Sequence, residues 1–307
     1  MNSESVHPEL RAALQKLPRM DHSKRLIRTI GRLGPRLLRS PRVADVTVRW
    51  VRFGGLRLRI YEPRRSSGRP AVLWIHGGGL VIGSPKQDDR LCLSTVAALG
   101  IPVVSVEYRL APESPFPAAL HDALTTWRWI HDNADALGID PARVVVAGES
   151  AGGSIAASLV HKLHDDGGIQ PAAQWLFAPM LDDRTAARRE LDATDHPVWN
   201  NKANRFGWRS YLNQEPGAAT VPPYSVPSRR SDLSNLPPTW LCAGDIELFY
   251  DEIAAYAERL RAAGVAVEFE TVVGGAHGFE NWAGNTQLAQ NLIERAQRWL
   301  AATLDLE

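Results

Sequence analysis

Ser150 lies at the centre of a pentapeptide, Gly148-Glu149-Ser150-Ala151-Gly152, that joins two segments of different periodicity. The β-branched run Val144–Ala147 before it is typical of a buried strand, and the apolar residues of Gly153–Asp165 after it recur at helical spacing. Glycines two positions to either side permit a sharp strand-to-helix turn that exposes the central hydroxyl. The following helix also directs the positive end of its dipole toward this point. We therefore predict that Ser150 is a nucleophile.

A serine hydroxyl needs a general base at neutral pH, and in this type of turn the base follows an acid in the chain order Ser, acid, His. Beyond the helix after Ser150 the chain contains His196 and His277. His196 lies in a long segment that lacks strand patterns, whereas His277 comes directly after the last predicted strand and is followed by Gly278. A loop at that position can carry the imidazole over the end of the sheet. We predict that His277 is the base.

Two acidic residues, Asp245 and Glu247, compete for the role of the orienting acid. Both follow a predicted strand and precede His277. Both Ser-His-Asp and Ser-His-Glu arrangements occur in proteins, so the residue type does not choose between them. The local sequence leaves both residues open.

A run of three glycines follows His76 directly after the predicted strand Ala71–Ile75. Successive glycines let several backbone N–H groups turn toward one point, which is the arrangement that stabilises a tetrahedral oxyanion. Beside the turn at Ser150, this loop indicates acyl transfer.

Short apolar runs alternate with helical segments from Val43 onward. This alternation favours an α/β fold in which a mostly parallel, eight-stranded sheet carries helices on both faces. The predicted strands are Val46–Val51 and Leu56–Tyr61, which form a hairpin, and then Ala71–Ile75, Pro102–Tyr108, Val144–Ala147, Ala173–Phe177, Thr239–Ala243 and Val267–Val272. The predicted helices are Asp88–Leu99, Pro117–Ala136, Gly153–Asp165, Asp251–Ala263 and Gln287–Leu300.

The composition is that of a soluble globular chain. Its 307 residues are 44% hydrophobic, and 35 basic against 34 acidic side chains give a net charge of +1, so we expect no nucleic-acid partner. The two cysteines, Cys92 and Cys242, lie far apart in a predicted helix and a predicted strand, which suits a reducing compartment. Without a signal-like or membrane-spanning apolar run, the sequence predicts a cytoplasmic protein.

The segment from Arg19 to Arg42 is strongly basic, with eight Lys and Arg residues against one acid, Asp21. Apolar residues recur in it at helical spacing, so an amphipathic helix is predicted. Such a helix can dock on a membrane surface or pack its apolar stripe on its own domain with the arginines in solvent. We expect the second arrangement and no membrane contact.

These motifs, taken in order, resemble those of the hormone-sensitive-lipase-like family of bacterial carboxylesterases, within the α/β-hydrolases. The usual family turn has Asp where this chain has Glu149, a difference that we expect to be tolerated. The matching segments are Leu73–Gly79, Glu107–Glu113 with Pro115–Pro117, Gly148–Gly153, Asp251-Glu252 with Ala255–Val265, and His277–Phe279.

The resemblance implies roles and boundaries for this chain. Registered on the family pattern, the acid of the triad is Glu247, with Asp245 as the alternative, and the oxyanion donors are the N–H groups of Gly78, Gly79 and Ala151. Residues 1–42 and 181–234 would form a helical cap over an α/β-hydrolase core of residues 43–180 and 235–307. The cap aromatics expected at the acyl pocket are Trp199, Phe206, Trp208 and Tyr211.

The implied function is a serine carboxylesterase that hydrolyses small-molecule esters with short to medium acyl chains, without a metal or organic cofactor. An amidase, an arylformamidase or a deacetylase would share the same residues. A non-catalytic ligand receptor on this fold is disfavoured because such receptors lack the histidine that His277 supplies here. The family also implies a possible homodimer through Val267–Val272 and Gln287–Leu300.

Overall fold

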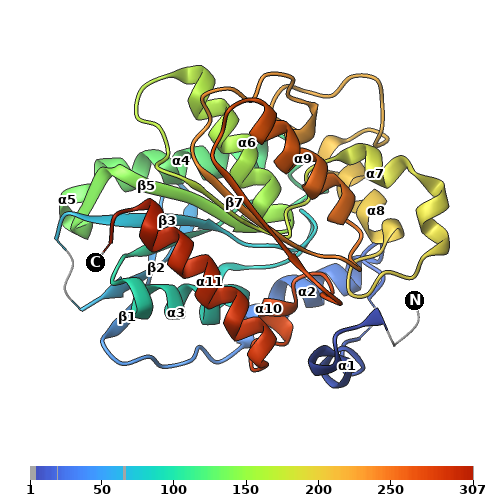
Figure 1. Cartoon of the computed structure of the whole chain (residues 1–307), viewed down its shortest axis with the longest axis horizontal. Coiled ribbons are helices and arrows are strands. Elements are labelled where there is room, and N and C mark those ends of the chain that lie inside the picture. The colour runs from blue at the N-terminus through green and yellow to red at the C-terminus, as the bar shows by residue number, and fades with distance from the viewer. Residues whose placement is uncertain (1–4, 19, 65–66, 307) are drawn as a thin grey trace.

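A computed structural model describes residues 5–18, 20–64 and 67–306; Arg19 of the basic segment lies outside these ranges. One eight-stranded sheet, in the order β1-β2-β4-β3-β5-β6-β7-β8, runs through the molecule (Figure 1). The strands are β1 (Val46–Phe53), β2 (Leu56–Pro63), β3 (Arg69–Ile75), β4 (Val103–Glu107), β5 (Ile139–Glu149), β6 (Gln174–Phe177), β7 (Thr239–Gly244) and β8 (Val267–Val272).

The direction of the strands changes only near one end of the sheet. β1 pairs with β2 and β2 with β4 in antiparallel fashion, whereas the pairs from β4 through β3 to β8 are parallel. Gly54 and Gly55 form the hairpin turn with φ values of +55° and +82°, a backbone region that favours glycine. The predicted mostly parallel, eight-stranded sheet is confirmed.

Helices cover both faces of this sheet, as predicted (Figure 1). On one face lie α4 (Ala118–Asp132), α6 (Ala151–Asp166) and α9 (Tyr250–Ala262), and on the other lie α3 (Asp89–Leu99) and α11 (Gln287–Thr303). Two short helices, α5 (Ala134–Leu137) and α10 (Phe279–Trp282), and the 3-10 turn Pro85–Asp88 complete the core.

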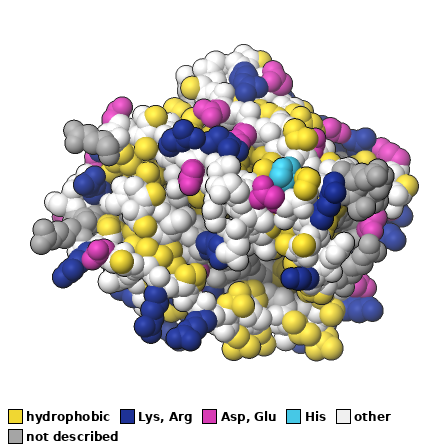
Figure 2. Space-filling model, turned by 60° about the horizontal axis from the view of Figure 1, so that its bottom comes forward, with side chains coloured by type: hydrophobic (Ala, Val, Ile, Leu, Met, Phe, Trp, Pro, Cys, Tyr) yellow, Lys and Arg dark blue, Asp and Glu magenta, His cyan; other side chains and the backbone are white. Residues whose placement is uncertain are grey.

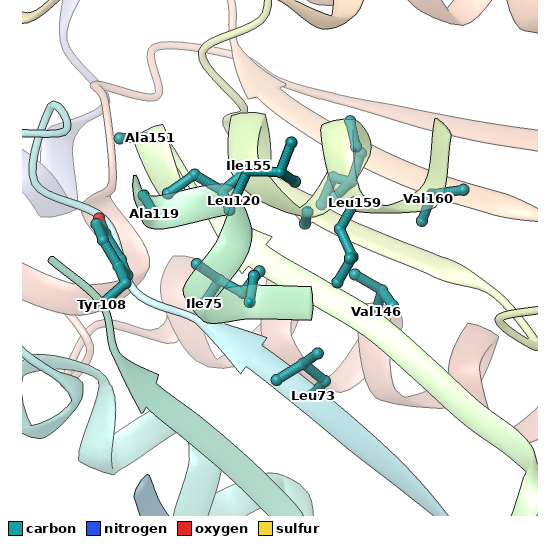
Figure 3. Close-up of a cluster of buried hydrophobic side chains, with 14 of the residues drawn as sticks. Leu73, Ile75, Tyr108, Ala119, Leu120, Val146, Ala151, Ile155, Leu159 and Val160 are labelled. Atoms are coloured by element: carbon teal, nitrogen blue, oxygen red, sulfur yellow. The ribbon is translucent and has the colours of Figure 1, made fainter. Parts of the chain in front are cut away.

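The first hydrophobic layer holds the sheet against α4 and α6 (Figure 3). Leu73 and Val146 point from neighbouring strands toward Ile155 and Leu159 of α6, with Leu120 of α4 beside them. All five side chains are buried. Because alternate residues of a strand face opposite sides, Trp74 joins the second layer beneath α3 and α11. The apolar sequence of β3 therefore supports a helix layer on each face.

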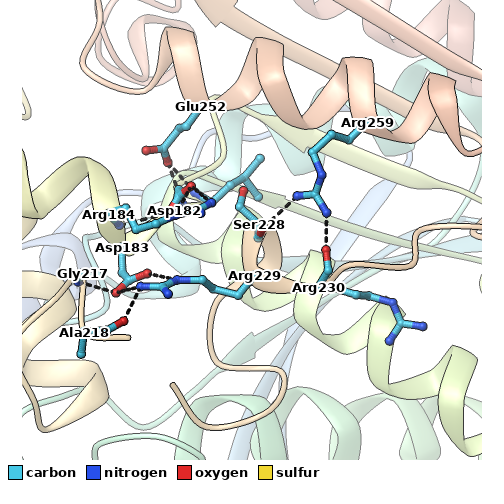
Figure 4. A network of polar contacts seen from close by, with 11 residues as sticks. Asp182, Asp183, Arg184, Gly217, Ala218, Ser228, Arg229, Arg230, Glu252 and Arg259 are labelled. Atoms are coloured by element: carbon cyan, nitrogen blue, oxygen red, sulfur yellow. Dashed lines mark hydrogen bonds and ion pairs between the residues drawn. The ribbon is translucent and has the colours of Figure 1, made fainter. Parts of the chain in front are cut away.

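The segment between β6 and β7 contains α7 (Asp183–Ala187), α8 (Asn201–Leu212) and the 3-10 turns Arg189–Ala193 and Pro227–Arg229. Polar contacts connect its two ends to the core (Figure 4). Glu252 of α9 accepts a hydrogen bond from the N–H of Leu181 at 2.6 Å, and the fully buried Asp183 pairs with Arg229 at 2.8 Å. Arg259 of α9 donates to the carbonyl of Ser228 at 2.8 Å. Glu252 and Arg259 thus hold the two ends of the helical segment to α9, and the pair of Asp183 with Arg229 joins those ends to one another.

The N-terminal segment contains α1 (Pro8–Leu14) and α2 (Arg25–Leu37). The prediction that the apolar stripe of this segment packs on the domain is wrong. Arg32 of α2 donates to the carbonyls of Val81 and Ala111 at 2.9 and 2.8 Å, and Arg36 pairs with Glu107 at 2.9 Å. The body presents carbonyl and carboxylate oxygens at this place, and guanidinium groups satisfy those acceptors where leucines cannot. Arg28, Arg32 and Arg36 therefore lie on the side of α2 that faces the core, whereas Arg25 and the leucines of the helix are exposed.

Cys92 in α3 and Cys242 in β7 are both buried, and neither forms a disulfide. Within the described part of the chain, no helix combines the length and the apolar character needed to cross a membrane.

Candidate active site

Ser150 occupies the turn between β5 and α6 in a strained conformation. Its φ of 53° and ψ of −119° are rarely adopted by a residue with a side chain. A Cβ at Gly148 would meet the carbonyl of Gly152, and a Cβ at Gly152 would meet the carbonyl of Ile75, so neither position has room for a side chain. The N–H of Ser150 donates to the carbonyl of Phe177 at 2.8 Å, which holds the turn against β6.

The structure brings His277 and Glu247 to Ser150. The His277 Nε2 atom lies 2.8 Å from Ser150 Oγ, and His277 Nδ1 lies 2.5 Å from Glu247 Oε2. All three side chains are buried. In the neutral tautomer with a proton on Nδ1, the serine hydroxyl donates to Nε2 and Nδ1–H donates to the carboxylate. This geometry permits a proton to move from Ser150 to His277 while Glu247 orients the ring.

Two aromatic residues hold His277 in place, one through its ring and one through its backbone carbonyl. The ring of Phe249 packs edge-on against that of His277, with centroids 5.2 Å apart, and the indole N–H of Trp282 donates to the His277 carbonyl at 2.9 Å. Gly278, the next residue, has a φ of +63° and begins α10. The loop after β8 therefore presents the histidine in one orientation.

Asp245, the alternative acid, lies elsewhere. Its side chain is exposed, and its Oδ1 atom accepts a hydrogen bond from the N–H of Gly274 at 2.7 Å. Asp245 thus supports the start of the loop that carries His277. Of the two acids left open by the local sequence, Glu247 is the one that reaches the imidazole.

The glycine loop after β3 lies against the turn at Ser150. A Cβ at Gly77 would be 3.4 Å from the Cβ of Ser150. Gly78 and Gly79 have φ values of +119° and +57°, and a Cβ at Gly78 would collide with the carbonyl of Ile82. The backbone of this loop therefore approaches Ser150 closely because it carries no side chains, and Ala151 opens α6 beside it.

His76 fixes this loop from below. Its ring stacks on Tyr108, with centroids 4.2 Å apart, and its Nδ1 lies 2.8 Å from the carbonyl of Gly77. Burial lowers the pKa of His76 to about 4, so the neutral imidazole donates through Nδ1–H to that carbonyl. The Tyr108 hydroxyl donates to the carbonyl of His76 at 3.0 Å. The motif at residues 107–113 thus contributes to holding the loop.

The four aromatic residues predicted for the acyl pocket occupy different surroundings. The indole of Trp199 lies over Gly79, where a Cβ would overlap it. Phe206 packs under the guanidinium of Arg28, 5.2 Å from the ring centroid. Trp208 and Tyr211 are buried beside one another within the helical segment, with ring centroids 6.2 Å apart. Trp199 is therefore the aromatic that borders the glycine loop.

A cluster of three buried acids, Asp88, Glu149 and Glu280, lies beneath the turn at Ser150. Of these, only Glu149 was singled out from the sequence. Asn281 donates both to Glu149 and, at 3.1 Å, to Asp88, which also accepts from the indole N–H of Trp74 at 2.7 Å. Burial raises the pKa values of Asp88 and Glu280 to about 7 and that of Glu149 well above its usual range. Asp88, Glu149 and Glu280 are distant in sequence, so their spacing does not reveal the cluster. The one local indication was that Glu280 and Asn281 come just after His277.

The pattern of the α/β hydrolase fold matches residues 72–281, which contain the strands and loops just described. This chain belongs to the α/β hydrolase fold family. Esterase LipI of Mycobacterium tuberculosis is 34% identical over 79% of this chain and 76% of its own, and ethyl acetate hydrolase of Pseudomonas putida is 34% identical over 73% and 71%. A bacterial heroin esterase of known structure superposes with a TM-score of 0.90 at 35% identity, covering 98% of each chain.

Within the α/β hydrolases, this chain is a carboxylesterase of the hormone-sensitive-lipase-like group, as its motifs predicted. The shared fold runs the whole length of the core and places the strand-to-helix turn, the glycine loop and the histidine loop at one end of the sheet.

Proposed function

We propose that Ser150, His277 and Glu247 are the catalytic triad of this carboxylesterase. Its proposed substrates are esters with acyl groups of short to medium length. The observation that carries the proposal is the unbroken chain of two hydrogen-bond distances, 2.8 Å from Ser150 to His277 and 2.5 Å from His277 to Glu247. Such a relay activates a hydroxyl that is otherwise a weak nucleophile.

The first half-reaction forms an acyl-enzyme. Ser150 Oγ attacks the ester carbonyl carbon while His277 Nε2 takes the hydroxyl proton, and Glu247 stabilises the resulting imidazolium. The tetrahedral intermediate then collapses: its bond to the alcohol oxygen breaks, and His277 Nε2 donates its proton to that oxygen. The alcohol leaves, and the acyl group stays bonded to Ser150.

The backbone N–H groups of Gly78, Gly79 and Ala151 are assigned the role of stabilising the negatively charged oxygen of the tetrahedral intermediate. The close approach of the glycine loop to Ser150 supports this assignment, as does the place of Ala151 at the start of α6. Loss of one such donor raises the barrier by about 2.7–4 kcal/mol in comparable enzymes.

In the second half-reaction, water replaces the alcohol. His277 takes a proton from water as the water oxygen attacks the acyl carbon, and then returns the proton to Ser150 Oγ as the acyl–serine bond breaks. The carboxylic acid product leaves, and Ser150 and His277 regain their starting protonation states.

The proposed length of the acyl group depends on the bulk of the helical segment between β6 and β7, to which Trp199 belongs. Trp199 lies over Gly79, and this bulk limits the space at the oxyanion end of the site. The names of two similar proteins, ethyl acetate hydrolase and heroin esterase, support an acyl group at the short end of the range. We expect acyl chains of about eight carbons or fewer.

Release of p-nitrophenol from acetate, butyrate, octanoate and palmitate esters tests this function. Wild type should hydrolyse the first three, with palmitate the slowest, and Ser150→Ala should lose activity by at least about 10⁴-fold. A rate that rises steadily toward palmitate would contradict the acyl-length proposal. Retained activity in Ser150→Ala would contradict the triad, and turnover of amides in place of esters would favour an amidase.

Trp199→Ala separates a pocket role from a packing role. If Trp199 limits the pocket, the variant should gain activity on palmitate relative to butyrate. Trp208→Phe, within the buried interior of the helical segment, is the matched control and should leave the ratio unchanged. Equal losses on all esters in Trp199→Ala would show that the ring holds the loop and does not select substrates.

A further inference from the structure

The outward face of α2 is a row of large apolar side chains. Leu26, Ile30, Leu33 and Leu37 follow one another at helical spacing and are 70%, 53%, 47% and 86% exposed. Leu38, directly after the helix, is 56% exposed. Amphipathic helices of globular proteins bury such a stripe, and contiguous exposed apolar patches mark interaction sites. We define these five residues as the apolar row.

The orientation of α2 is held by its other face. Arg28 is buried and donates to the carbonyls of His22 and Ser23 at 3.0 and 2.8 Å, and Arg32 bonds to two carbonyls of the core. Turning the helix to bury the apolar row would remove these charged donors from their acceptors, which is unfavourable for buried charges. The row therefore stays available to an external partner.

Basic side chains lie at both ends of the apolar row. Lys24 and Arg25 are exposed at its start, and Arg39 and Arg42 are exposed beyond its end. Among the residues that the structure describes, Arg25, Arg39 and Arg42 have no acidic partner in an ion pair. Figure 2 shows one face of the molecule, on which hydrophobic side chains gather along the lower edge with Lys and Arg side chains beside them.

The basic residues at both ends of the apolar row favour one of two partners, a second copy of the chain or a lipid surface. A symmetric dimer through the apolar row would bring the same basic residues of two copies together, and like charges across an interface are unfavourable. An anionic lipid surface is complementary to the pattern, because its acyl region accepts the leucines and its phosphates accept the arginines. We propose that α2 docks the protein on an anionic membrane surface, with the apolar row inserted and Arg39 and Arg42 at the headgroups.

Docking would place the catalytic end of the molecule close to the lipid. Gly31 of α2 packs on Ile82, where an added Cβ would be 3.0 Å from the side chain, and Ile82 accompanies Gly78 in the glycine loop. One helix thus separates the lipid surface from that loop. The proposal concerns where the protein binds and stands whether or not the triad assignment is correct.

Sedimentation of the full-length chain with vesicles tests the proposal. Protein should pellet with vesicles of phosphatidylglycerol and phosphatidylcholine, stay in solution with pure phosphatidylcholine, and be released by high salt. Ile30→Ser/Leu33→Ser and Arg39→Glu/Arg42→Glu should each weaken binding by at least roughly tenfold. Ile169→Ser, at a residue 51% exposed in the loop between α6 and β6, is the matched control and should bind as wild type.

Thermal melting of each variant shows that it is folded, which is expected because every substituted side chain is exposed. Absence of binding to anionic vesicles would overturn the proposal, as would binding that Ile30→Ser/Leu33→Ser does not weaken. A concentration-dependent dimer that this double variant abolishes, without vesicle binding, would assign the row to a second copy of the chain and also overturn it.

Discussion

The indole ring of Trp199 lies directly over Gly79, in the space that a Cβ atom at residue 79 would fill. The segment between β6 and β7 therefore touches the glycine loop at Gly79. Gly207 of α8 makes a second approach, because a Cβ there would be 2.7 Å from the Gly79 carbonyl. The geometry of this loop and the packing of the helical segment consequently depend on one another.

If the Gly79 N–H is an oxyanion donor as proposed, Gly79→Ala should lower ester hydrolysis by about 10²- to 10³-fold, since the new methyl group must displace either Trp199 or that N–H. The φ of +57° adds backbone strain. The measurement is kcat/KM for p-nitrophenyl butyrate. Gly100→Ala is the matched control, because Gly100 has a similar φ of +64° with nothing near its added Cβ, and it should retain activity.

Adding Trp199→Ala to Gly79→Ala distinguishes two causes of the lost activity: overlap of the new methyl group with the indole, and backbone strain at residue 79. If the overlap causes the loss, the double variant should recover part of the activity, so the two effects will not add. Additive losses would show that the left-handed backbone at residue 79 is the whole cause.

Glu247→Gln should lower kcat by about 10⁴-fold, because an amide in place of the carboxylate no longer favours the required histidine tautomer. Asp245→Asn should change kcat by less than about tenfold, since Asp245 bonds to the N–H of Gly274 and its amide oxygen can still accept. Steady-state hydrolysis of p-nitrophenyl butyrate at saturating substrate measures both. A larger loss in Asp245→Asn than in Glu247→Gln would reverse the assignment of the acid.

The buried Glu280 should make the folded protein less stable as the pH rises. Its pKa is raised from 4.5 to about 7, so between these values the unfolded chain releases a proton that the folded chain retains. Stability is unaffected by this group below about pH 4.5, falls up to about pH 7 and then levels off. Glu280→Gln should therefore gain in melting temperature relative to wild type between pH 5 and pH 8.

Glu294→Gln, on the exposed face of α11, is the control for this comparison and should show no such gain. A constant difference between Glu280→Gln and wild type across the pH range would mean that Glu280 is ionised in the folded protein throughout.

Asp183→Asn should destabilise the protein by about 3–5 kcal/mol, because it leaves Arg229 without its buried partner. Asp183 is fully buried and Arg229 is 18% exposed, so water replaces the lost interaction poorly. Lys162→Met removes the more exposed pair with Asp166 and should cost less than about 1 kcal/mol. Urea unfolding measures both, and equal effects would contradict a stabilising role of the buried pair.

The elements of the core were accessible from sequence because each carries its own local signal. Alternating β-branched runs and helical spacing predicted all eight strands and the helices around them. The helical run predicted as Pro117–Ala136 is divided into α4 and α5 around Asn133, a break that periodicity does not register. The turn at Ser150 and the loop of His277 were predicted in the same way, from the glycines beside Ser150 and His277.

The position of Glu247 relative to His277 required the tertiary structure or a family pattern. Asp245 and Glu247 are two residues apart in the loop after β7, and each has the right chemistry. The path of that loop turns Glu247 into the interior and leaves Asp245 at the surface. Likewise, Asp88 and Glu149 meet beneath the turn only because β3 and β5 are neighbours in the sheet.

By itself, the sequence determined the fold class and predicted the turn at Ser150 and the loop of His277, because local spacing and glycine placement encode them. The tertiary structure decided which way α2 faces. Periodicity reports which residues share a face of a helix, but the surface opposite the helix selects the face that is buried. Here that surface offers backbone carbonyls to Arg32 and a carboxylate to Arg36, so these two side chains turn inward and Leu33 and Leu37 remain outside.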